Sequence, residues 1–393
     1  MSTPRLLYLG QAFPPGVSAR FPELQPAGHL IETNLVESVR PWFDIRSVGV
    51  SSLDLENLPP TDASSPGLPH ALNLTEKPPE LLHRWKALRR LQRAFQSWCD
   101  DGWRPEVIVV CNLSPIYNAF IRWLRRRPSR PRLVLYLADS ATLGVKIHWS
   151  RRLRYRFKPL VYPDEEMVDC FDACVAVSRS NQARFAARGI PWLWQPNGCD
   201  PRRAIRDAGS IDGPVSFGYF GSLAEHTGLP ALLQLFTARP RPNPLHLAGF
   251  GKNKAAIAEL CGRQPNVQFA SGLTPDECLQ FAQQCDVLIN PRPLWPGNEN
   301  NFASKVFEYA LAGRAILTSR VSGVDLVLGE EAFYFDETDF DRSLGGALVR
   351  VAETPRAELR RSGAAIQSRL LTEFSWQRQG ERLAQFIHAV LGG

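Results

Sequence analysis

The sequence predicts an α/β protein built from two doubly wound domains, each with a parallel sheet covered by helices. Short apolar strands alternate with amphipathic helices through the first half, and the same alternation restarts after a turn-rich segment at residues 196–201. This alternation is typical of parallel sheets. A chain of 393 residues is also too long for one compact core. We therefore expect two domains, residues 1–198 and 199–375.

In the first domain, each apolar run is followed by a helical pattern. The expected strands are Arg5–Leu9, Ile45–Val50, Val107–Cys111, Leu133–Leu137, Ala173–Val177 and Trp192–Trp194. The expected helices are His29–Val39, Leu81–Trp98, Ile116–Arg125, Trp149–Phe157 and Asn181–Arg188. The Pro- and Ser-rich stretch Leu58–Pro79 predicts a loop.

The second domain repeats this order. Its expected strands are Ser216–Phe220, Leu245–Ala248, Val267–Ala270, Val287–Asn290 and Ala315–Thr318. Its expected helices are Gly228–Thr237, Lys254–Cys261, Pro275–Gln284, Phe302–Ala312 and Arg356–Glu373, and the pattern of Trp376–Leu391 predicts one more helix.

The composition narrows the class of protein. The apolar share of 44% is ordinary for a globular chain. No apolar run reaches the length of about 18 residues that a spanning helix needs. The first ten residues lack the pattern of a secretory signal. The eight cysteines form no Cys-x-x-Cys pair, and no cluster completes a metal site. We therefore expect a cytoplasmic protein with reduced cysteines.

The segment that follows Val287–Ile289 carries the strongest functional signal. A stiff Pro-rich loop leads into the helix predicted at Phe302–Ala312, and Gly313 ends that helix. Lys305 and Glu308 are three residues apart, so they share one face of the helix. A cation near a helix N-terminus, with a carboxylate one turn on, suits a ligand that carries phosphate and sugar hydroxyls.

This segment resembles the sugar-nucleotide motif of retaining GT-B glycosyltransferases, especially glycosyltransferase family 4. In that motif seven residues separate two Glu residues. Glu308 matches the second, and Asn300 stands where the first is usual, while the form Ser-Lys-x-x-Glu-Tyr…Gly is similar to a common variant. The resemblance implies a GT-B fold, with two Rossmann-like domains facing across a cleft and the helix at 376–391 packed back on the first. It implies that Glu308 binds the donor ribose, and that Lys305 and the backbone of Asn301, Phe302, Ala303 and Ser304 hold the diphosphate.

Other loops match the family less closely. Gly221, in Phe217–Leu223, allows the close backbone approach that a phosphate-cradling turn requires. Family members usually have Arg and Lys at this turn, but Ser222 and Thr227 occupy those positions here. Either Lys305 with Lys252 or Arg292 supplies the missing charge, or donor binding is weak or altered.

In the first domain, the resemblance points to two positions. It implies that Gly16 lies in a loop over the donor or acceptor and that Asp139 faces the sugar as a catalytic residue. The strand Leu133–Leu137 ends just before Asp139, at the edge where parallel sheets bind ligands. The other interpretation of Asp139 is a carboxylate that balances the neighbouring arginines.

The spacing of the acids does not support a two-carboxylate mechanism of the glycosidase type. The mechanism proposed for the family is front-face displacement, in which the leaving diphosphate takes the acceptor proton and the protein supplies positioning and charge. No Asp-x-Asp motif stands near the donor segment. We therefore expect a nucleotide-sugar substrate, no cofactor and no metal.

Basic and aromatic residues alternate in the first domain. Residues 120–160 carry many Arg and Lys but one acid, Asp139. Arginines beside Trp are typical of interfacial helices. We therefore expect the first domain to bind an anionic membrane surface at the inner face of the membrane, and we expect a lipid-linked or cell-surface glycan as acceptor. The residues expected on this surface are Trp85, Arg89, Arg122, Trp123, Arg126 and Arg152. The alternatives are a solvated basic face, or nucleic-acid binding, for which no known motif is present.

Two other functions remain open at this stage. A sugar-nucleotide epimerase or hydrolase on the same fold would need an acid/base set, for which Asp139, Glu165 and Glu166 are the candidates. A non-catalytic partner protein would have lost donor binding through Ser222 and Thr227.

Overall fold

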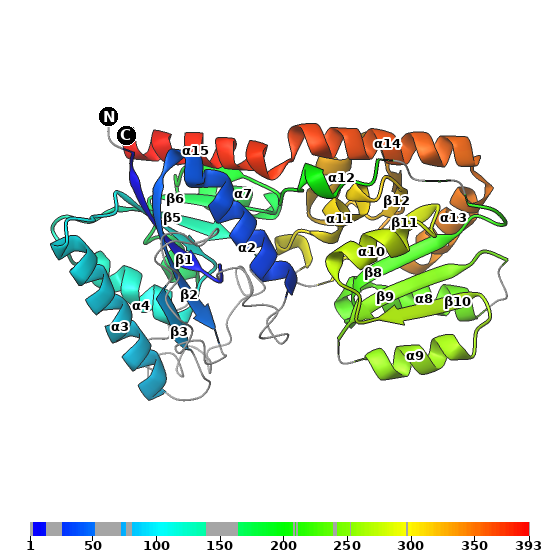
Figure 1. Cartoon of the computed structure of the whole chain (residues 1–393), viewed down its shortest axis with the longest axis horizontal. Helices are drawn as coiled ribbons and strands as arrows, with labels where there is room; N and C mark the ends of the chain where they lie inside the picture. The colour runs from blue at the N-terminus through cyan, green and yellow to red at the C-terminus, as the bar shows by residue number, and fades with distance from the viewer. Residues whose placement is uncertain are drawn as a thin grey trace. The chain divides into compact units, whose positions relative to one another are not determined.

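The computed structural model describes residues 3–12, 26–51, 72–75, 81–138, 164–206, 209, 211–238, 242–251, 253–295 and 298–392. The chain forms two compact units, one of Met1–Gln195 with Gln379–Gly393 and one of Pro196–Arg378. Each unit contains one parallel sheet with helices on its faces (Figure 1).

The first unit has a seven-stranded parallel sheet in the order β3-β2-β1-β4-β5-β6-β7. The strands are β1 (Arg5–Gly10), β2 (Asp44–Ser51), β3 (Leu72–Thr75), β4 (Val107–Cys111), β5 (Arg132–Leu137), β6 (Ala173–Ala176) and β7 (Trp192–Trp194). The described helices are α2 (Pro26–Val39), α3 (Leu81–Asp100), α4 (Pro115–Leu124), α6 (Asp164–Val168), α7 (Gln182–Ala186) and α15 (Trp376–Gly392).

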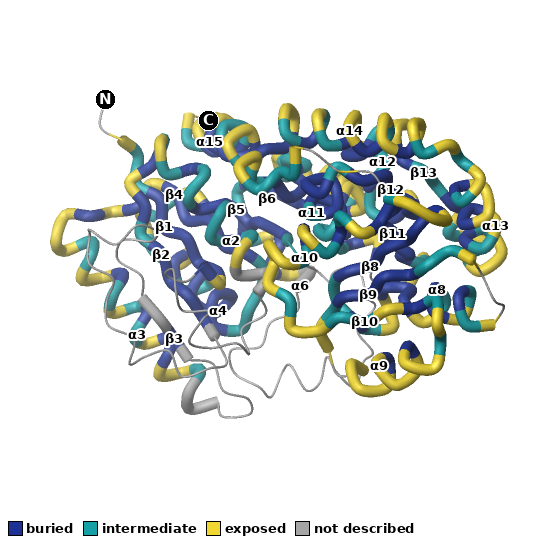
Figure 2. The backbone as a smooth tube through the Cα atoms, turned by 45° about the vertical axis from the view of Figure 1, so that its right-hand side comes forward, coloured by how far each residue is buried: buried dark blue, intermediate teal, exposed yellow. Residues whose placement is uncertain are grey.

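The central strands of this sheet are buried on both faces, as their continuous apolar runs predict (Figure 2). On one face, Leu7, Leu9 and Ile108 pack with residues of α3 and α4. On the α2 side, Gly380 of α15 lies against the backbone of Ser38, where a Cβ would not fit.

The second unit has a six-stranded parallel sheet in the order β10-β9-β8-β11-β12-β13. The strands are β8 (Phe217–Ser222), β9 (Leu245–Phe250), β10 (Val267–Ser271), β11 (Val287–Asn290), β12 (Ala315–Thr318) and β13 (Phe333–Tyr334). The helices are α8 (Leu229–Thr237), α9 (Lys254–Gly262), α10 (Pro275–Ala282), α11 (Lys305–Leu311), α12 (Val324–Leu328), α13 (Phe340–Glu353) and α14 (Arg356–Glu373).

Alternate strand residues of this sheet point to two helix layers. Phe217, Tyr219, Leu245 and Val287 share one core with α8 and α13. On the other side, α14 lies along α11 and β12 (Figure 1). Two doubly wound units confirm the predicted α/β class.

Several elements differ from the sequence expectations. The stretch Leu58–Pro79 includes the edge strand β3, which pairs with β2. The helix expected at Phe302–Ala312 begins only at Lys305, because the preceding backbone forms turns, with the amide of Ser304 donating to the carbonyl of Phe302. The helix α13 was not predicted, since adjacent glycines at 345 and 346 weaken its helical pattern. The helix expected at Trp149–Phe157 lies outside the described residues.

Candidate functional site

The candidate donor site lies where the strand order of the second sheet reverses. The strands β8 and β11 are neighbours, and the chain continues outward from them in opposite directions across the sheet. Open parallel sheets bind ligands beyond the carboxyl ends of their strands at such a point. Here β8 ends at Gly221–Ser222, and β11 runs into the loop that leads to α11. The predicted donor segment therefore starts at the position that the fold favours for a ligand.

Lys305 is the first residue of α11, and its side chain reaches the end of β8. Its Nζ donates to the hydroxyl of Tyr219 at 2.9 Å and lies 4.1 Å from the centre of that ring. The Tyr219 hydroxyl in turn donates to the carbonyl oxygen of Ser222. A Cβ on Gly221, whose φ is +142°, would lie 3.4 Å from Nζ. The ammonium group is therefore fixed directly beside the glycine turn.

Burial changes the acid–base behaviour of this lysine. Desolvation, with a smaller contribution from the positive charge of Arg292, lowers the pKa of Lys305 to about 7. A partly buried amine that is shielded from water near another cation loses its proton more easily because both factors disfavour the charged form. An anion bound at the turn would reverse this effect.

Buried polar side chains hold the loop between β11 and α11. The side-chain amide nitrogen Nδ2 of Asn298 donates to the backbone carbonyls of His226 and Pro293 at 3.0 and 2.9 Å. The Ser322 hydroxyl contacts the carbonyls of Asn298 and Asn301 at 2.5 and 2.6 Å. Gly228, with φ of +79°, brings the start of α8 so close that a Cβ would overlap the carbonyl oxygen of Pro291. The described backbone at Pro291, Asn298 and Asn301 is thus held relative to the turn after β8.

Glu308 stands one helical turn after Lys305 and is paired with an arginine that the sequence analysis did not identify. Nη1 of Arg203 donates to Oε1 of Glu308 at 3.0 Å, and its Nε donates to Oδ1 of Asp276 at 2.9 Å. The Glu308 side chain keeps 39% of its surface exposed. Arg203 is 105 positions away in sequence, so no local pattern could have indicated this ion pair.

The same helix is locked to the sheet by Tyr309. Its hydroxyl accepts from the amide of Phe220 at 3.2 Å and lies 3.0 and 3.2 Å from the carbonyls of Phe220 and Ile289. Burial raises the pKa of Tyr309, which keeps the hydroxyl protonated as a donor. The Lys305 and Glu308 side chains therefore project from a helix with a fixed position on β8 and β11.

The four backbone amides expected to hold the diphosphate are not equivalent. The amides of Asn301 and Ser304 donate to the carbonyls of Asn298 and Phe302. Within the part of the chain that the structure describes, the amides of Phe302 and Ala303 have no such acceptor. Asn300 is buried, with 9% of its surface exposed.

The two residues that replace the family's cations are held by the turn itself. The hydroxyl of Ser222 accepts from the amide of Ala224 at 3.4 Å, and the hydroxyl of Thr227 donates to the carbonyl of Ala224 at 2.6 Å. Arg292 is buried, and its guanidinium donates to the carbonyl of Asn298 at 3.4 Å. Lys305 lies beside this turn, and Arg292 is close enough to contribute to the lowered pKa of Lys305. Gly16, Asp139, Arg152 and Lys252 lie outside those residues.

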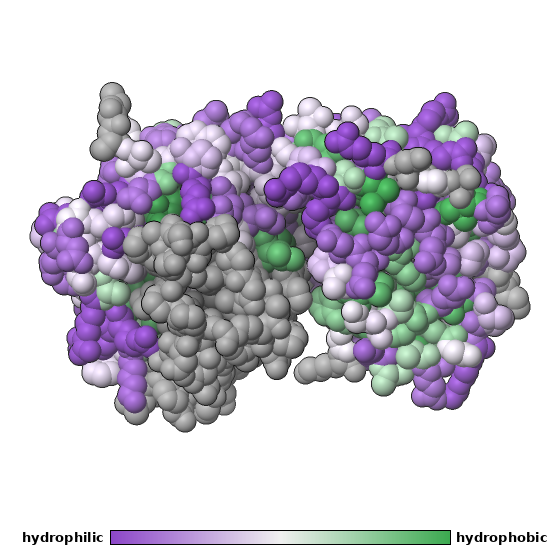
Figure 3. All heavy atoms as spheres, viewed as in Figure 1, coloured by the Kyte–Doolittle hydropathy of each residue, from purple (hydrophilic) through white to green (hydrophobic). Residues whose placement is uncertain are grey.

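The predicted basic surface is mixed in character. Trp85 is 50% exposed, and the guanidinium of Arg89 lies 4.9 Å from the centre of its ring. By contrast, Trp123 packs against Phe95 and Phe120, with ring centres 6.0 and 5.4 Å away. Arg122 is half-buried and Arg126 is exposed. The outer side of α3 is largely hydrophilic in the space-filling view (Figure 3).

A buried carboxyl group in the first unit was also missed. Oε2 of Glu32, on α2, accepts from the Tyr8 hydroxyl at 2.8 Å and from the amide of Gln11 at 2.5 Å, at the carboxyl end of β1. Burial raises the pKa of Glu32 to about 7. A single acid on an otherwise apolar helix face is the signal that could have indicated it.

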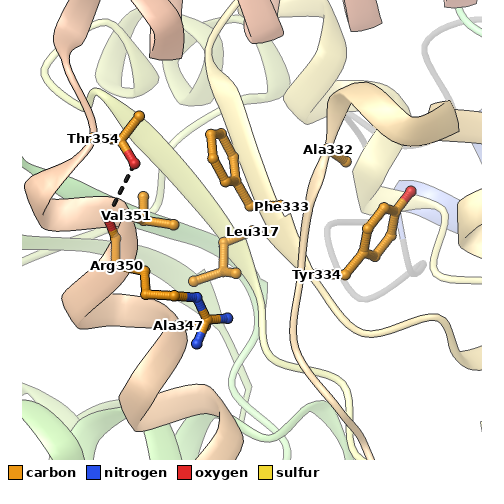
Figure 4. A pocket seen from close by; sticks show the side chains of 8 residues that line it. All are labelled: Leu317, Ala332, Phe333, Tyr334, Ala347, Arg350, Val351 and Thr354. Carbon is orange, nitrogen blue, oxygen red and sulfur yellow. Dashed lines mark hydrogen bonds between the residues drawn. The ribbon is translucent and has the colours of Figure 1, made fainter.

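A pocket of about 360 Å³ opens at the β13 edge of the second sheet (Figure 4). Leu317, Phe333 and Val351 supply apolar lining, and the hydroxyl of Thr354 donates to the carbonyl of Arg350 at 3.0 Å. None of the predicted site residues lines this pocket. It is therefore separate from the candidate donor site.

The described residues include no group of three or more His, Cys, Asp or Glu side chains that could hold a metal ion. Within the same residues, no helix has both the length and the apolar character needed to cross a membrane.

Comparisons with solved structures give the fold of the whole chain. It is similar to sucrose-phosphate synthase from Thermosynechococcus elongatus, with 14% identity, a TM-score of 0.69 and 99% of each chain covered. It is also similar to the lipopolysaccharide outer core galactosyltransferase WaaB, with 13% identity, a TM-score of 0.66, and 98% of this chain and 99% of that chain covered. A third similar structure is Anabaena HepE in complex with UDP and glucose, with 13% identity, a TM-score of 0.65 and the same coverage.

One protein family matches part of the second unit in sequence. Residues 214–354 match the family described as glycosyl transferases group 1, and this match includes β8, the glycine turn and α11. No curated protein matches the sequence of the chain. The fold of the whole chain confirms the predicted GT-B fold, and the match over residues 214–354 agrees with the predicted glycosyltransferase of the group 1 type.

Proposed function

We propose that this enzyme transfers a sugar from a nucleotide-sugar donor to a glycan acceptor with retention of the anomeric configuration. The observation that carries the proposal is the pair of Lys305 and Glu308 on one fixed helix at the switch point of the second sheet. Lys305 supplies charge beside the glycine turn, and Glu308 offers a carboxylate about one turn away. A nucleoside diphosphate presents a diphosphate and a ribose diol at a comparable separation.

Family members have positively charged side chains at the turn after β8, whereas here the positive charge comes from residues outside that turn. Lys305, with the guanidinium of Arg292 close enough to affect its pKa, replaces the cations absent at Ser222 and Thr227. The amides of Phe302 and Ala303 add uncharged donors beside them. This set stabilises the negative charge that grows on the leaving diphosphate as the glycosidic bond breaks.

In the proposed reaction, the acceptor oxygen attacks the anomeric carbon on the face from which the diphosphate leaves. The bond from the anomeric carbon to the diphosphate oxygen breaks, and that oxygen takes the proton of the acceptor hydroxyl. The described residues act by positioning and charge stabilisation. We propose that no metal is required, and that Asp139 faces the transferred sugar.

The descriptions of similar structures supply the donors that we propose to test first. Their descriptions name UDP and glucose for the Anabaena protein and UDP-2-fluoro glucose for the trehalose-6-phosphate protein of E. coli. We propose UDP-sugars as the first donors to test. A screen of UDP-, ADP- and GDP-sugars for nucleotide release, with added acceptors, would identify the donor, and NMR of the product would report its anomeric configuration. Full activity after dialysis against EDTA is the expected result for metal-free transfer.

The substitution Glu308→Ala tests the site directly. We expect kcat/KM to fall by about a hundredfold, because two hydrogen bonds to a charged group together contribute about 3 kcal/mol. The control is Glu259→Ala, which removes an exposed carboxylate on α9 that pairs with Arg263. Unchanged turnover in Glu308→Ala, with the fold intact, would remove Glu308 from the site.

We further propose a lipid-linked or cell-surface glycan as acceptor, with the first unit docked on an anionic membrane. Trp85 with Arg89 is the best candidate for contact, because Trp123 is already used in packing. One similar structure is described as a lipopolysaccharide outer core galactosyltransferase. Vesicles containing phosphatidylserine should bind the protein at low salt and release it at high salt.

Matched variants distinguish docking through this surface from a general effect of the protein's net charge on vesicle binding. Trp85→Ala with Arg89→Ala should weaken vesicle binding, whereas Arg263→Ala, which removes an exposed cation of the second unit, should have little effect. Absence of binding at low salt would exclude the docking surface and leave the donor site unaffected.

A further inference from the structure

Arg203 links the start of the second unit to the carboxylate proposed to bind ribose. It is the last residue of the short 3-10 helix η3 (Pro201–Arg203), whose N-cap residue is Asp200. Nη1 of Arg203 holds Oε1 of Glu308 at 3.0 Å, and Nε holds Oδ1 of Asp276 at 2.9 Å. The planar guanidinium is thus fixed at two of its edges.

The backbone on both sides of Arg203 is also held. Before it, the amide of Cys199 donates to the carbonyl of Phe374 at 3.0 Å. After it, the amide of Ile205 donates at 2.8 Å to the carbonyl of Leu311, the last residue of α11. Arg203 therefore reaches Glu308 from a segment attached to the same helix that carries Glu308. Such a fixed geometry is what positions a side chain for a ligand.

The ion pair leaves part of the carboxylate available. Arg203 occupies Oε1 of Glu308, and among the described residues no hydrogen bond is made to Oε2. The Glu308 side chain is 39% exposed, whereas that of Arg203 is 26% exposed. A vicinal diol needs an accessible acceptor oxygen with a defined direction. The pair satisfies both requirements, since the arginine lies deeper and the carboxylate nearer to solvent.

We infer that Arg203 is the positioning residue for donor ribose: it fixes the Glu308 carboxylate through Oε1 and leaves Oε2 to accept from the ribose hydroxyls. The inference rests on the proposed role of Glu308 and adds to it the residue on which that role depends. Without Arg203, the glutamate side chain would have to be ordered during binding, which costs rotamer freedom. Ribose recognition then weakens although Glu308 is still present.

The test compares nucleotides with and without the 2′-hydroxyl. The affinities of UDP and 2′-deoxy-UDP, of ADP and 2′-deoxy-ADP, and of GDP and 2′-deoxy-GDP are measured by calorimetry, and the pair whose ribonucleotide binds most tightly is used. The readout is the dissociation constant of the 2′-deoxynucleotide divided by that of the matching ribonucleotide. Loss of net charge or partial unfolding changes both affinities alike, whereas loss of ribose positioning changes the ratio.

We expect Arg203→Ala to reduce this ratio by about fivefold or more, toward the value of Glu308→Gln. Arg203→Lys keeps the charge and one donor, so it should recover part of the ratio and serves if the alanine variant fails to fold. The matched control is Arg202→Ala, since Arg202 is the neighbouring arginine of η3, is 89% exposed and pairs with Asp200. That variant should keep the wild-type ratio.

The outcomes separate the two proposals. If Glu308→Gln reduces the ratio while both Arg203 variants stay within about twofold of wild type, the positioning role is refuted and the ribose role of Glu308 stands. If Glu308→Gln leaves the ratio unchanged, or if none of the nucleotides binds, the proposed donor site itself is wrong. Tighter binding of the ribonucleotide to Arg203→Ala would show that Arg203 competes with ribose, which also overturns the inference.

Discussion

Binding of a nucleoside diphosphate to this enzyme should take up a proton at Lys305. In the unliganded chain, burial and the charge of Arg292 lower the pKa of this lysine to about 7. A diphosphate beside the turn at Gly221 places negative charge near Nζ, which favours the ammonium form and raises the pKa again. The enzyme must then bind a proton together with the ligand whenever the pH is above about 7.

The size of the effect follows from the fraction of Lys305 that is charged before binding. With a pKa near 7, about half of the amine is protonated at pH 7, about a tenth at pH 8 and about a hundredth at pH 9. The apparent affinity should therefore fall about fivefold from pH 7 to 8 and about tenfold from pH 8 to 9. These steps correspond to about 1 and 1.4 kcal/mol. The phosphate groups contribute little, because their last ionisation lies near pH 6.

Calorimetry of UDP binding at pH 7, 8 and 9, in two buffers that differ in ionisation enthalpy, measures both the affinity and the protons taken up. The control is Lys305→Met, which keeps an unbranched chain over Tyr219 but cannot be charged. It should bind more weakly and with a flat pH dependence. The reasoning fails if wild type takes up no proton at pH 8, or if the methionine variant keeps the same slope.

Two predictions concern stability. Gly228→Ala should lower the free energy of unfolding by at least about 2 kcal/mol, because φ is +79° and the new Cβ would overlap the carbonyl of Pro291. In urea titrations the control Gly262→Ala, which has open space around it, should be close to neutral. Equal effects of the two substitutions would contradict this prediction. The raised pKa of Glu32, about 7 against an ordinary 4.5, means that the folded state holds this proton more tightly, so its contribution to stability is fully present below pH 4.5 and is lost as the pH rises through 7. Glu32→Gln should remove this loss and gain roughly 3 kcal/mol relative to wild type between pH 4.5 and 8, and a gain that does not change with pH would refute it.

The sheet strands could be predicted because their signal is local. Runs such as Val107–Cys111 and Val287–Ile289 are apolar throughout, as buried parallel strands require, and both lie in strands. The edge strand β3 could not, since a strand with one neighbour needs no long apolar run and lies here among prolines and serines. The start of α11 was placed three residues early because the hydrogen bonds of Asn298 and Ser322, which hold the loop, are made to distant backbone.

The candidate site was also predictable only where its residues lie close together in sequence. Lys305 and Glu308 could be identified because both stand on one short helix with a family pattern. Their partners could not: Tyr219 has the appearance of an ordinary strand residue, and Arg203 is separated from Glu308 by 105 positions. The sequence showed that two cations were missing at Ser222 and Thr227, but only the structure shows the lysine reaching their turn.

The replacement changes the physical character of the proposed donor site. An arginine at the turn after β8 would carry its charge at every physiological pH. Lys305 does not, because its surroundings lower its pKa to about 7. The charge at this turn therefore depends on whether an anion is bound, and the helix that carries the lysine also carries Glu308 and is fixed to the sheet by Tyr309. A shift of α11 would thus disturb the proposed diphosphate and ribose contacts together, so substitutions that loosen this helix should weaken binding of the whole nucleotide rather than of one half of it.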